Sequence, residues 1–291
     1  MPKIEKFLLV DGNLLMFQSF YASYSPYYEP MHNKEGITTN GIHVFFTTLF
    51  RLIKKFKPKY MFVAFDSDSN TWRKQEFPDY KAGREKAPLI IFEQFKYVKQ
   101  LLTDLKIPWL EKSGDEADDL IATLAASNDY LWNIVFSKDK DLLQLVNENT
   151  IVYKYDSYNK EYITIDYENF YDYYRIEPEQ IPDFKGLAGD NSDNLRGVKG
   201  IGDKTAINLL NKYHTLENIY EHLDECKESV KNKLIIDKES AFKCKRLAVL
   251  NRLVDMDKNI ENYQFFIDKK TPISLLEKLE LDTILNQLEE I

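Results

Sequence analysis

The sequence has little of what a disulfide-bonded, zinc-binding or membrane-spanning protein needs. Only two cysteines occur among 291 residues, and no Cys-x-x-Cys pair is present. The four histidines are scattered without the spacing of zinc ligands. The longest apolar run, residues 60–65, has six residues, whereas a membrane helix needs roughly 18. We therefore expect no disulfide framework, no zinc site and no membrane span.

The N-terminus also lacks the long apolar region and small-residue cleavage site of a secretory signal. Hydrophobic residues make up 44% of the chain, which is enough to bury a substantial core. The expectation is a soluble, cytoplasmic protein that acts as a monomer.

The net charge of −8 argues at first against a nucleic-acid partner, because phosphate backbones favour basic surfaces. That argument depends on where the acids lie. If nine of the 47 acids hold metal ions, the others nearly balance the 39 lysines and arginines. A local basic patch would then suffice to bind DNA.

The first half of the chain alternates short apolar runs with helical patterns, as parallel α/β folds do. Three apolar runs predict buried strands, and each is followed closely by an acid. The chain also shows two helical patterns and a later strand pair. The strands are expected at 7–10, 60–65 and 133–137, the helices at 39–57 and 115–126, and the strand pair at 150–155 and 161–165.

From about residue 167 the chain becomes mainly helical, with a glycine-rich centre at 186–202 and an amphipathic end at 275–291. We expect an α/β fold with a mainly parallel central sheet flanked by helices. The α/β domain would span 1–170, with a long loop at about 67–92. A helical region would span 171–291, with a helix-hairpin-helix at about 186–212.

Nine carboxylates stand out because they gather in dense motifs after strands and at helix starts. One motif is an Asp-x-Asp after a strand, another an acid-rich helix start, and a third a glycine-flanked turn. The nine are Asp11, Asp66, Glu116, Asp118, Asp119, Asp139, Asp141, Asp190 and Asp193. In an open parallel sheet, ligands bind beyond the carboxyl ends of the strands, so these acids are expected to converge there.

Carboxylates packed this densely cannot all stay ionised unless cations neutralise them. Sites built only from oxygen ligands favour Mg²⁺ or Mn²⁺ over zinc. Two or more such ions can activate water and stabilise both oxygens of an in-line phosphoryl displacement. The alternative is that the acids are solvated helix caps and surface ion-pair partners.

The segment Gly197–Ala206 has the Gly-x-Gly pattern of a hairpin that leads into a helix. Such a turn presents backbone N–H groups at a helix N-terminus, which suits a phosphate. Lys199 and Lys204 would add positive charge. This arrangement binds the DNA backbone rather than bases. The alternative is a tight turn between two helices with incidental lysines.

The segment 67–86 mixes basic and aromatic side chains after the second strand. Basic residues interleaved with aromatics suit a path for single-stranded nucleic acid, where phosphates pair and bases stack. Its lack of periodicity suggests a functional loop, although a solvated insertion would have a similar composition. The residues are Arg73, Lys74, Lys81, Arg84 and Lys86 with Trp72, Phe77 and Tyr80.

Together these motifs resemble the 5′ nuclease family, which includes the N-terminal nuclease domain of bacterial DNA polymerase I, phage 5′ exonucleases and flap endonucleases. Six motifs occur in the family's order and cover nearly the whole chain. They are residues 9–12, 65–66, 80–84, 116–119, 137–141 and 189–206.

The resemblance implies that residues 1–170 form a PIN-like nuclease domain with an arch at about 67–92, and that 171–291 form a DNA-binding region. It also implies a role for each matching residue. Asp11, Asp66, Glu116, Asp118 and Asp139 would hold the catalytic metal cluster. Four further acids would complete a second cluster, partly through water: Asp119, Asp141, Asp190 and Asp193.

The basic segment and the hairpin receive roles from the same resemblance. Lys81 and Arg84 would act on the scissile phosphate, and Tyr80 would stack on a terminal base. The remaining implied DNA contacts are Arg73 and, in the hairpin, Val198, Lys199, Gly200, Gly202, Lys204 and Thr205. The hairpin of relatives also holds a monovalent cation such as K⁺.

Two positions depart from the family's pattern. Gln18 stands where many relatives have an arginine, so one phosphate contact is expected to be weaker or to come from elsewhere. The stretch Pro88–Phe92 is apolar where relatives are usually polar, which leaves the order of the arch open. No polymerase sequence follows the acidic tail that ends at Ile291, and we expect a protein that stands alone.

The implied function is a Mg²⁺-dependent 5′–3′ exonuclease and flap endonuclease. It would hydrolyse DNA at 5′ ends or flaps, with RNA primers on DNA as further substrates, during replication and repair. Two other functions remain open at this point. A PIN-type ribonuclease shares an acid-lined α/β crevice, and a catalytically idle protein could bind DNA junctions without cutting them.

Overall fold

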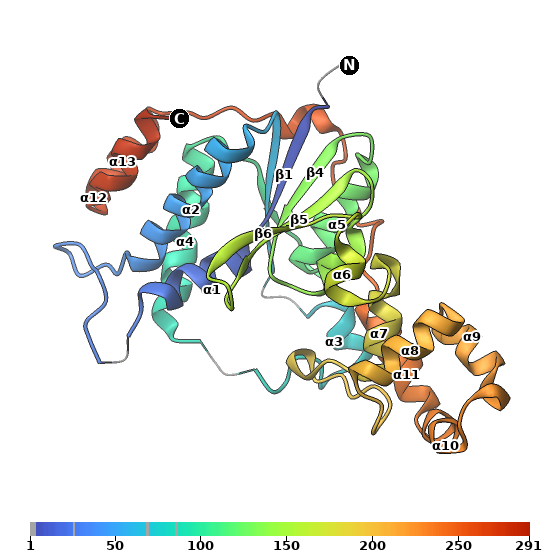
Figure 1. Ribbon diagram of the computed structural model, residues 1–291. Coiled ribbons are helices and arrows are strands. Elements are labelled where there is room, and N and C mark those ends of the chain that lie inside the picture. Colours follow the sequence, from blue (N-terminus) through green and yellow to red (C-terminus); the bar gives the residue numbers. More distant parts are fainter. Residues whose placement is uncertain (1–3, 26, 68–69, 85–86) are drawn as a thin grey trace.

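The computed structural model describes residues 4–25, 27–67, 70–84 and 87–291, and the statements below concern those residues (Figure 1). Lys86, one of the basic residues of the expected DNA path, lies outside them. Within the described residues, no helix has the length and apolar character needed to span a membrane.

Six strands form a single sheet in the order β3-β2-β1-β4-β5-β6. The four pairs from β3 to β5 are parallel, and only the last pair, β5 and β6, is antiparallel. The sheet therefore matches the expected mainly parallel architecture. The strands are β1 Lys6–Asp11, β2 Tyr60–Phe65, β3 Trp109–Glu111, β4 Trp132–Phe136, β5 Thr150–Asp156 and β6 Glu161–Ile165.

The central strands are buried on both faces, which explains their continuous apolar sequences. In β1, Leu8 and Val10 face one layer of helices, while Phe7 and Leu9 face the other. All four side chains are fully buried. The short edge strand β3 carried too little sequence signal to be expected.

One face of the sheet is covered by three long helices and by the end of the chain. The helices α1 and α2 pack side by side, and α4 packs against α2. Their buried phenylalanines, including Phe45 and Phe46, fill this layer. The elements are α1 Gly12–Ser23, α2 Asn40–Phe56, α4 Leu89–Asp104, α12 Ile273–Lys278 and α13 Asp282–Glu289.

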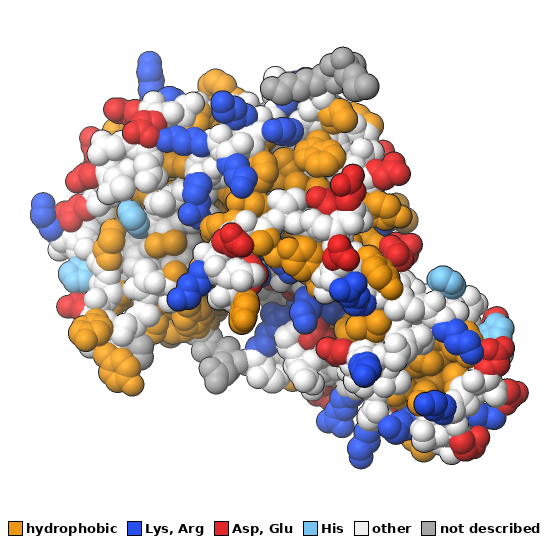
Figure 2. Space-filling view, in the orientation of Figure 1, with side chains coloured by type: hydrophobic (Ala, Val, Ile, Leu, Met, Phe, Trp, Pro, Cys, Tyr) orange, Lys and Arg blue, Asp and Glu red, His pale blue; other side chains and the backbone are white. Residues whose placement is uncertain are grey.

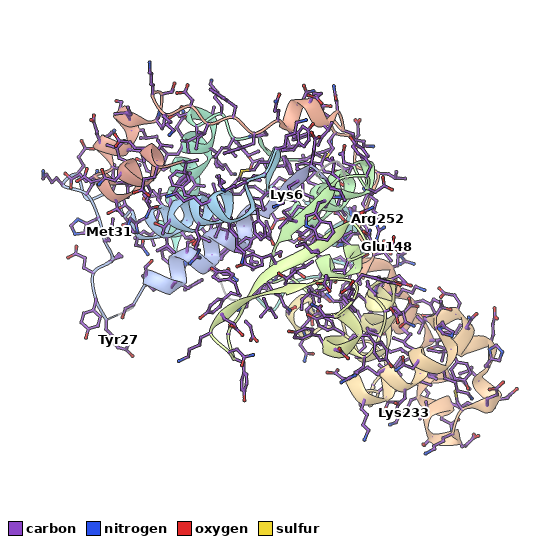
Figure 3. The ribbon with its side chains drawn as sticks, turned by 45° about the horizontal axis from the view of Figure 1, so that its top comes forward. Lys6, Tyr27, Met31, Glu148, Lys233 and Arg252 are labelled. Atoms are coloured by element: carbon purple, nitrogen blue, oxygen red, sulfur yellow. The ribbon has the colours of Figure 1, made fainter. Side chains whose placement is uncertain are left out.

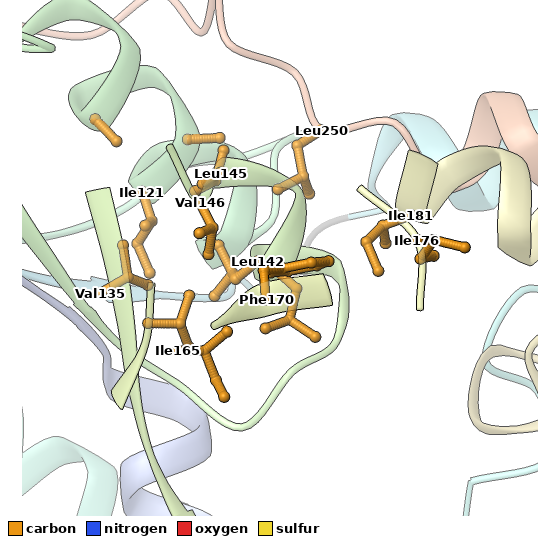
Figure 4. Close-up of a cluster of buried hydrophobic side chains, with 14 of the residues drawn as sticks. Ile121, Val135, Leu142, Leu145, Val146, Ile165, Phe170, Ile176, Ile181 and Leu250 are labelled. Atoms are coloured by element: carbon orange, nitrogen blue, oxygen red, sulfur yellow. The ribbon is translucent and has the colours of Figure 1, made fainter. Parts of the chain in front are cut away.

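The other face packs against α5 and against short helices that lead into a separate helical lobe. Figure 4 shows this layer, where Ile121, Val135 and Ile165 meet Leu142 and Phe170. The elements are α5 Ala117–Ser127, η1 Asp141–Leu145, α6 Phe170–Tyr174, η2 Pro178–Gln180 and α7 Ile181–Ala188.

The helical lobe projects from one end of the α/β body (Figure 1). Its helix α7 packs against both α8 and α11, which joins the lobe to the body. The remaining elements are η3 Asn191–Asp193, α8 Asp203–Tyr213, α9 Leu216–Glu221, η4 Leu223–Glu225, α10 Glu228–Ile236 and α11 Lys238–Ala248.

The C-terminal tail departs from the expected division into 1–170 and 171–291. After α11 the chain returns to the body, where η5 (Ile260–Tyr263) contacts β2 and α13 packs on α2. Leu276 and Ile284 are buried in the same core as the first strands. The amphipathic pattern at 275–291 thus marks a helix pair that covers the α/β body and does not belong to the helical lobe.

The expected arch at 67–92 is also shorter than expected in its described part. It contains one five-residue helix, α3 (Trp72–Glu76), and a turn around residues 79–83. The apolar stretch Pro88–Phe92 leads into α4, which begins at Leu89, and the side chain of Ile91 is fully buried. Core packing therefore accounts for Ile91, but not for Leu89 and Phe92, whose side chains are exposed.

Candidate metal and nucleic-acid site

The parallel sheet brings three of the expected acids to one edge. Asp11 ends β1, Asp66 follows β2, and Asp139 comes shortly after β4. Because β1 pairs in parallel with both β2 and β4, the carboxyl ends of the three strands lie side by side. Asp11 also caps α1, since its Oδ1 accepts a hydrogen bond from the Leu14 amide at 2.9 Å.

Neighbouring polar groups fix the orientation of these carboxylates. The Asn13 amide donates to Asp66 Oδ2 at 2.9 Å, and the Ala117 backbone N–H donates to Asp66 Oδ1 at 2.8 Å. Ser137 Oγ donates to Asp11 Oδ2 at 2.9 Å and accepts from the Asp139 amide. Neither Asn13 nor Ser137 was singled out as a functional residue from the sequence.

Asp118, from the first turn of α5, completes a group that we call the carboxylate pool: Asp11, Asp66, Asp118 and Asp139. Burial raises the pKa of Asp11 to about 7, and the negative charges of Asp66 and Asp139 add to that shift. Burial also raises the pKa of Asp118 well above its usual value, and the negative charges of Asp139 and Asp11 raise it further. The four acids are thus close enough to repel one another.

Glu116 borders the pool and accepts hydrogen bonds from the basic segment. Its Oε2 lies 3.2 Å from Lys81 Nζ and accepts from Tyr80 Oη at 3.3 Å. The same oxygen accepts from Arg73 Nη1 at 3.1 Å. Glu116 is buried, so these contacts replace the hydration of its carboxylate.

Asp119 and Arg73 lie differently from what the sequence led us to expect. Asp119 is fully buried and takes a two-pronged ion pair from Arg73, with Nη1–Oδ2 at 2.7 Å and Nη2–Oδ1 at 2.9 Å. Arg73 is only 2% exposed. In this conformation the carboxylate oxygens of Asp119 are occupied by Arg73, so they are not free to bind a metal ion. The side chain of Arg73 is buried and therefore not accessible to DNA.

The second group of expected metal ligands is held by a lysine that the sequence did not single out. Lys185 of α7 forms ion pairs with Asp141 and, at 2.6 Å, with Asp190 Oδ2. Burial raises the pKa of Asp141 to about 7, although the Lys185 charge opposes that shift. For Asp190, burial acts in the same direction, but contacts with Lys185 dominate and lower its pKa. A cation of the protein thus sits between two acids.

Asp193 joins the base of the arch to the helical lobe. Its carboxylate accepts from Arg84 Nη2 at 2.8 Å and from Tyr80 Oη at 3.1 Å. Its backbone carbonyl accepts from the Lys81 amide at 3.1 Å. Lys81 has a left-handed backbone with φ of 58°, which costs about 1–2 kcal/mol for a non-glycine residue. The contact with Asp193 holds that conformation.

Tyr80 does not stand where the expected base-stacking role would require. Its ring is 2% exposed and packs in a small cluster with Leu195 and Leu247. By contrast, the Arg84 side chain is 50% exposed and the Lys81 side chain is 16% exposed. Of the expected basic segment, Lys81 and Arg84 are therefore the charged groups beside the acids that solvent can reach.

A cleft of about 730 Å³ runs past these groups. Arg84, Asp139, Lys185 and Asp190 line its polar part, and α6 and α8 contribute apolar and aromatic side chains to the rest. A larger cavity of about 1010 Å³ lies between α3, α7 and the end of α11, and no residue of the carboxylate pool lines it.

As the side chains stand in the described residues, no three Asp, Glu, His or Cys groups are arranged to hold a metal ion. Lys185, Lys81 and Arg73 occupy oxygens of the surrounding acids. The donor chemistry of the pool nevertheless suits a hard divalent cation, because one buried and three half-buried carboxylates that repel one another would gain from one. Asp11, Asp66, Asp118 and Asp139 are the residues that would hold it.

The hairpin, residues 197–205, leaves a row of amides without protein acceptors. In the described residues, the N–H groups of Gly200, Gly202, Asp203 and Lys204 donate to no protein atom. Gly197 and Gly200 have left-handed φ values of 57° and 78°, which explains their glycines. The exposed amides at the start of α8 form a natural cradle for a phosphate.

The structure changes the expected DNA-contact role of two hairpin residues and adds a lysine that the sequence did not single out. Val198 is buried, so only its backbone could face DNA. The Lys199 amide donates to Asp237 Oδ2 at 2.8 Å, which occupies that N–H. The ammonium of Lys233, on α10, donates a hydrogen bond to the Gly200 carbonyl at 2.9 Å, and Lys233 lies on the surface of the lobe (Figure 3). Its position 33 residues from Gly200 gave no sequence signal.

Comparison with solved structures places the fold among flap nucleases. The flap endonuclease of bacteriophage T5, solved with DNA and metal ions, superposes with a TM-score of 0.69 at 20% identity and covers 98% of both chains. Flap endonuclease-1 from Methanococcus jannaschii gives a TM-score of 0.65 at 19% identity, over 98% of this chain and 91% of that one. At these identities the likeness concerns the fold.

Two family models settle the relationship at the level of sequence. The N-terminal resolvase-like domain of 5′-3′ exonucleases matches residues 6–175, and their C-terminal SAM fold matches residues 176–271. The chain belongs to the 5′-3′ exonuclease family. The expectation drawn from the six ordered motifs is thereby confirmed.

Named relatives fall into two kinds. A 5′-3′ exonuclease of Mycoplasmopsis pulmonis is 38% identical over 96% of this chain and 91% of its own length. Another from Aquifex aeolicus is 35% identical over 97% and 95%. The DNA polymerase I of Bacillus subtilis is 36% identical over the whole of this chain, which spans 33% of that relative.

Proposed function

We propose that this protein is a Mg²⁺-dependent 5′–3′ exonuclease and flap endonuclease that hydrolyses DNA at 5′ ends and at the base of 5′ flaps. The observation that carries the proposal is the adjacency of the carboxylate pool to Lys81 and Arg84, with the amide-lined hairpin in the neighbouring lobe. Family membership supports the reaction class, and the relatives named DNA polymerase I support a use in primer and flap removal.

The basic residues would bind and orient the phosphate to be cut. Burial alone would lower the pKa of Lys81, but Glu116 and Asp193 raise it, so the ammonium stays charged at neutral pH. Arg84 keeps half of its side chain exposed while Asp193 holds it at the cleft. Two charged groups next to the pool can stabilise the negative charge that develops on the phosphate oxygens.

Asp11, Asp66, Asp118 and Asp139 would hold the divalent ion, with Asp141 and Asp190 available for a second one once Lys185 moves aside. When bound, such ions activate water and act as Lewis acids on the phosphate. The choice of Mg²⁺ follows from the all-oxygen donor set, and Mn²⁺ has the same preference.

The hairpin would grip the backbone of the downstream duplex without reading its bases. Its free amides would donate hydrogen bonds to a phosphate, and Lys199, Lys204 and Lys233 surround them with positive charge. A K⁺ ion at this hairpin is part of the proposal, although Lys233 already brings a cation to the Gly200 carbonyl. Figure 2 shows lysine and arginine side chains along the lower edge of this lobe.

Product mapping on a duplex with a 5′-labelled flap tests the proposal directly. We expect cleavage near the flap junction in Mg²⁺ or Mn²⁺, no cleavage in EDTA, and a loss of at least about 100-fold in Asp139→Ala, since even indirect partners of metals cost 10- to 100-fold. Full activity in EDTA, or an unimpaired Asp139→Ala, would refute it. A flap made of RNA on DNA tests primer removal, and free single-stranded RNA should remain uncut.

A further inference from the structure

We propose that Arg73 and Asp119 form a buried joint that positions Glu116 and the phosphate-binding turn 79–84, and that neither residue touches a metal ion or DNA. This inference rests on the proposed function. It replaces both roles that the sequence suggested, since Asp119 was expected to hold metal and Arg73 to bind DNA.

Arg73 has no donor left to offer a phosphate. Its guanidinium carries five N–H groups, and the structure gives it five hydrogen bonds. Three go to the carboxylates of Glu116 and Asp119. The other two reach backbone carbonyls at the end of α11, Leu247 O at 2.8 Å and Val249 O at 3.1 Å.

Asp119 is equally saturated. Its Oδ1 accepts from Arg73 and from the Asn251 amide at 2.8 Å. Its Oδ2 accepts from Arg73, from Trp72 Nε1 at 3.3 Å and from the Glu116 amide at 3.3 Å. A carboxylate has about four lone-pair positions, so this one has no room for an ion without losing a partner.

The joint connects three parts of the chain. Arg73 comes from α3 at the start of the basic segment, Asp119 from the first turn of α5, and the carbonyls from the end of α11. Glu116 shares its Oε2 between Arg73, Tyr80 and Lys81. A displaced Arg73 would therefore shift Glu116 and Lys81 together.

A double-mutant cycle separates positioning from direct contact. The variants are Asp119→Asn, which keeps the shape of the carboxylate, Arg73→Gln, and the two combined. Asp118→Asn serves as a metal-ligand control, and Arg246→Gln as a control for losing an arginine on α11. Arg246 pairs with Glu76 and its side chain is 59% exposed. Each variant is assayed for kcat and KM on flap DNA, for Mn²⁺ binding by calorimetry, and for thermal unfolding.

If Arg73 and Asp119 position Glu116 and the turn 79–84, each single variant loses about 10- to 100-fold in kcat with little change in KM. The double variant is then no worse than the poorer single variant, because both changes break the same contact. Mn²⁺ affinity falls alike in Asp119→Asn and Arg73→Gln and much less than in Asp118→Asn. Arg246→Gln behaves as wild type.

Direct contact predicts a different pattern. If Asp119 is a metal ligand, Asp119→Asn loses Mn²⁺ affinity as severely as Asp118→Asn, while Arg73→Gln keeps it. If Arg73 binds a phosphate, Arg73→Gln raises KM and reduces the salt slope of DNA binding by about one. Either result, or additive effects in the double variant, would refute the positioning role of the Arg73–Asp119 pair.

Folding failure does not block the test. If Arg73→Gln unfolds, Arg73→Lys keeps the charge but lacks the planar set of five donors, and we expect it to fold with kcat still reduced. Full activity in Arg73→Lys would overturn the proposal. A wild-type protein that does not cleave flap DNA refutes the proposed function itself, whereas an active wild type with additive variants refutes only the joint.

Discussion

The carboxylate pool and the hairpin differ in the solvent exposure of their polar groups. The pool and the acids around it are largely buried, and protein cations and hydrogen bonds occupy many of their oxygens. In the hairpin, Gly200, Gly202 and Lys204 are exposed, and their amides have no partner in the described residues. Both surfaces suit phosphate chemistry, one through bound cations and the other through backbone amides.

The difference shows which site depends on the rest of the fold. Buried like charges are stable only while lysines, arginines or metal ions compensate them. Exposed amides keep water as a partner and need only the local backbone shape. We therefore expect changes around the pool to alter stability and metal dependence, and changes at the exposed positions of the hairpin to alter DNA affinity alone.

The largest expected effect concerns Lys185. Lys185→Met removes the cation between Asp141 and Asp190 but keeps the volume of the buried side chain. Breaking a buried ion pair from one side costs about 3–5 kcal/mol, so urea unfolding should show a loss of that size at pH 8. Mg²⁺ should recover part of it by taking the place of the ammonium.

Lys245→Met is the matched control for this prediction. Lys245 also pairs with two acids, Asp183 and Glu217, but its side chain is 20% exposed and no metal is proposed there. A smaller loss, of about 1 kcal/mol, without recovery in Mg²⁺ is expected. Equal losses in both variants, or equal recovery, would remove the distinction between the pool and an ordinary ion pair.

The next effect is the pH dependence of the metal-free protein. Burial raises the pKa values of Asp11 and Asp141 from 3.8 to about 7. The folded state then binds protons more tightly than the unfolded chain, so these two groups reduce stability as pH rises from about 4 to about 7. A divalent ion favours the ionised form and should reverse this trend.

Melting temperatures measured between pH 5 and pH 8, with EDTA or with Mg²⁺, test that sign. The gain in Tm from Mg²⁺ should grow as the pH rises. Asp11→Asn should flatten the metal-free profile, because its side chain no longer titrates. A gain that is constant across the range would contradict the assignment of the ion to these carboxylates.

A smaller effect, confined to DNA binding, is expected for Gly202→Ala. A Cβ at Gly202 would have no heavy atom within 4 Å, and its φ of −100° suits alanine. The fold should therefore be unaffected, while the methyl group keeps a phosphate from the amides. We expect KM for flap DNA to rise about tenfold, equivalent to about 1.4 kcal/mol, with kcat and Tm unchanged.

Gly197→Ala provides the contrast. Its φ is 57°, and a Cβ there would lie 2.4 Å from the Gly189 amide nitrogen. This variant should lose stability because backbone atoms must move. If Gly202→Ala lowers Tm as much as Gly197→Ala, or leaves KM unchanged, the hairpin does not act as an independent phosphate cradle.

The smallest effect is expected for Lys233→Gln. This change removes one positive charge beside the hairpin and should weaken DNA binding a few-fold at low salt. The slope of log K against log salt should fall by about one, as for the loss of one phosphate contact. Lys231→Gln, on the same helix and paired with Asp224, should leave the slope unchanged. Equal slopes for wild type and Lys233→Gln would exclude the contact.

Local patterns determined much of this protein. The strands β1, β2 and β4 agree with their apolar runs to within one or two residues, because burial on both faces requires continuous hydrophobic sequence. The Gly-x-Gly pattern predicted a hairpin that leads into a helix, and α8 begins directly after Gly202. The ordered acidic motifs led to the family, which the family models confirm.

Only the tertiary structure decided how the acids divide. Asp118 and Asp119 are neighbours in sequence, yet Asp118 joins the pool while Asp119 turns into the protein and pairs with Arg73. A helix sends consecutive side chains in different directions, and the partner in each direction comes from elsewhere in the chain. Lys185, Lys233 and the returning C-terminal helices follow the same rule, since their contacts span distant segments that no local pattern encodes.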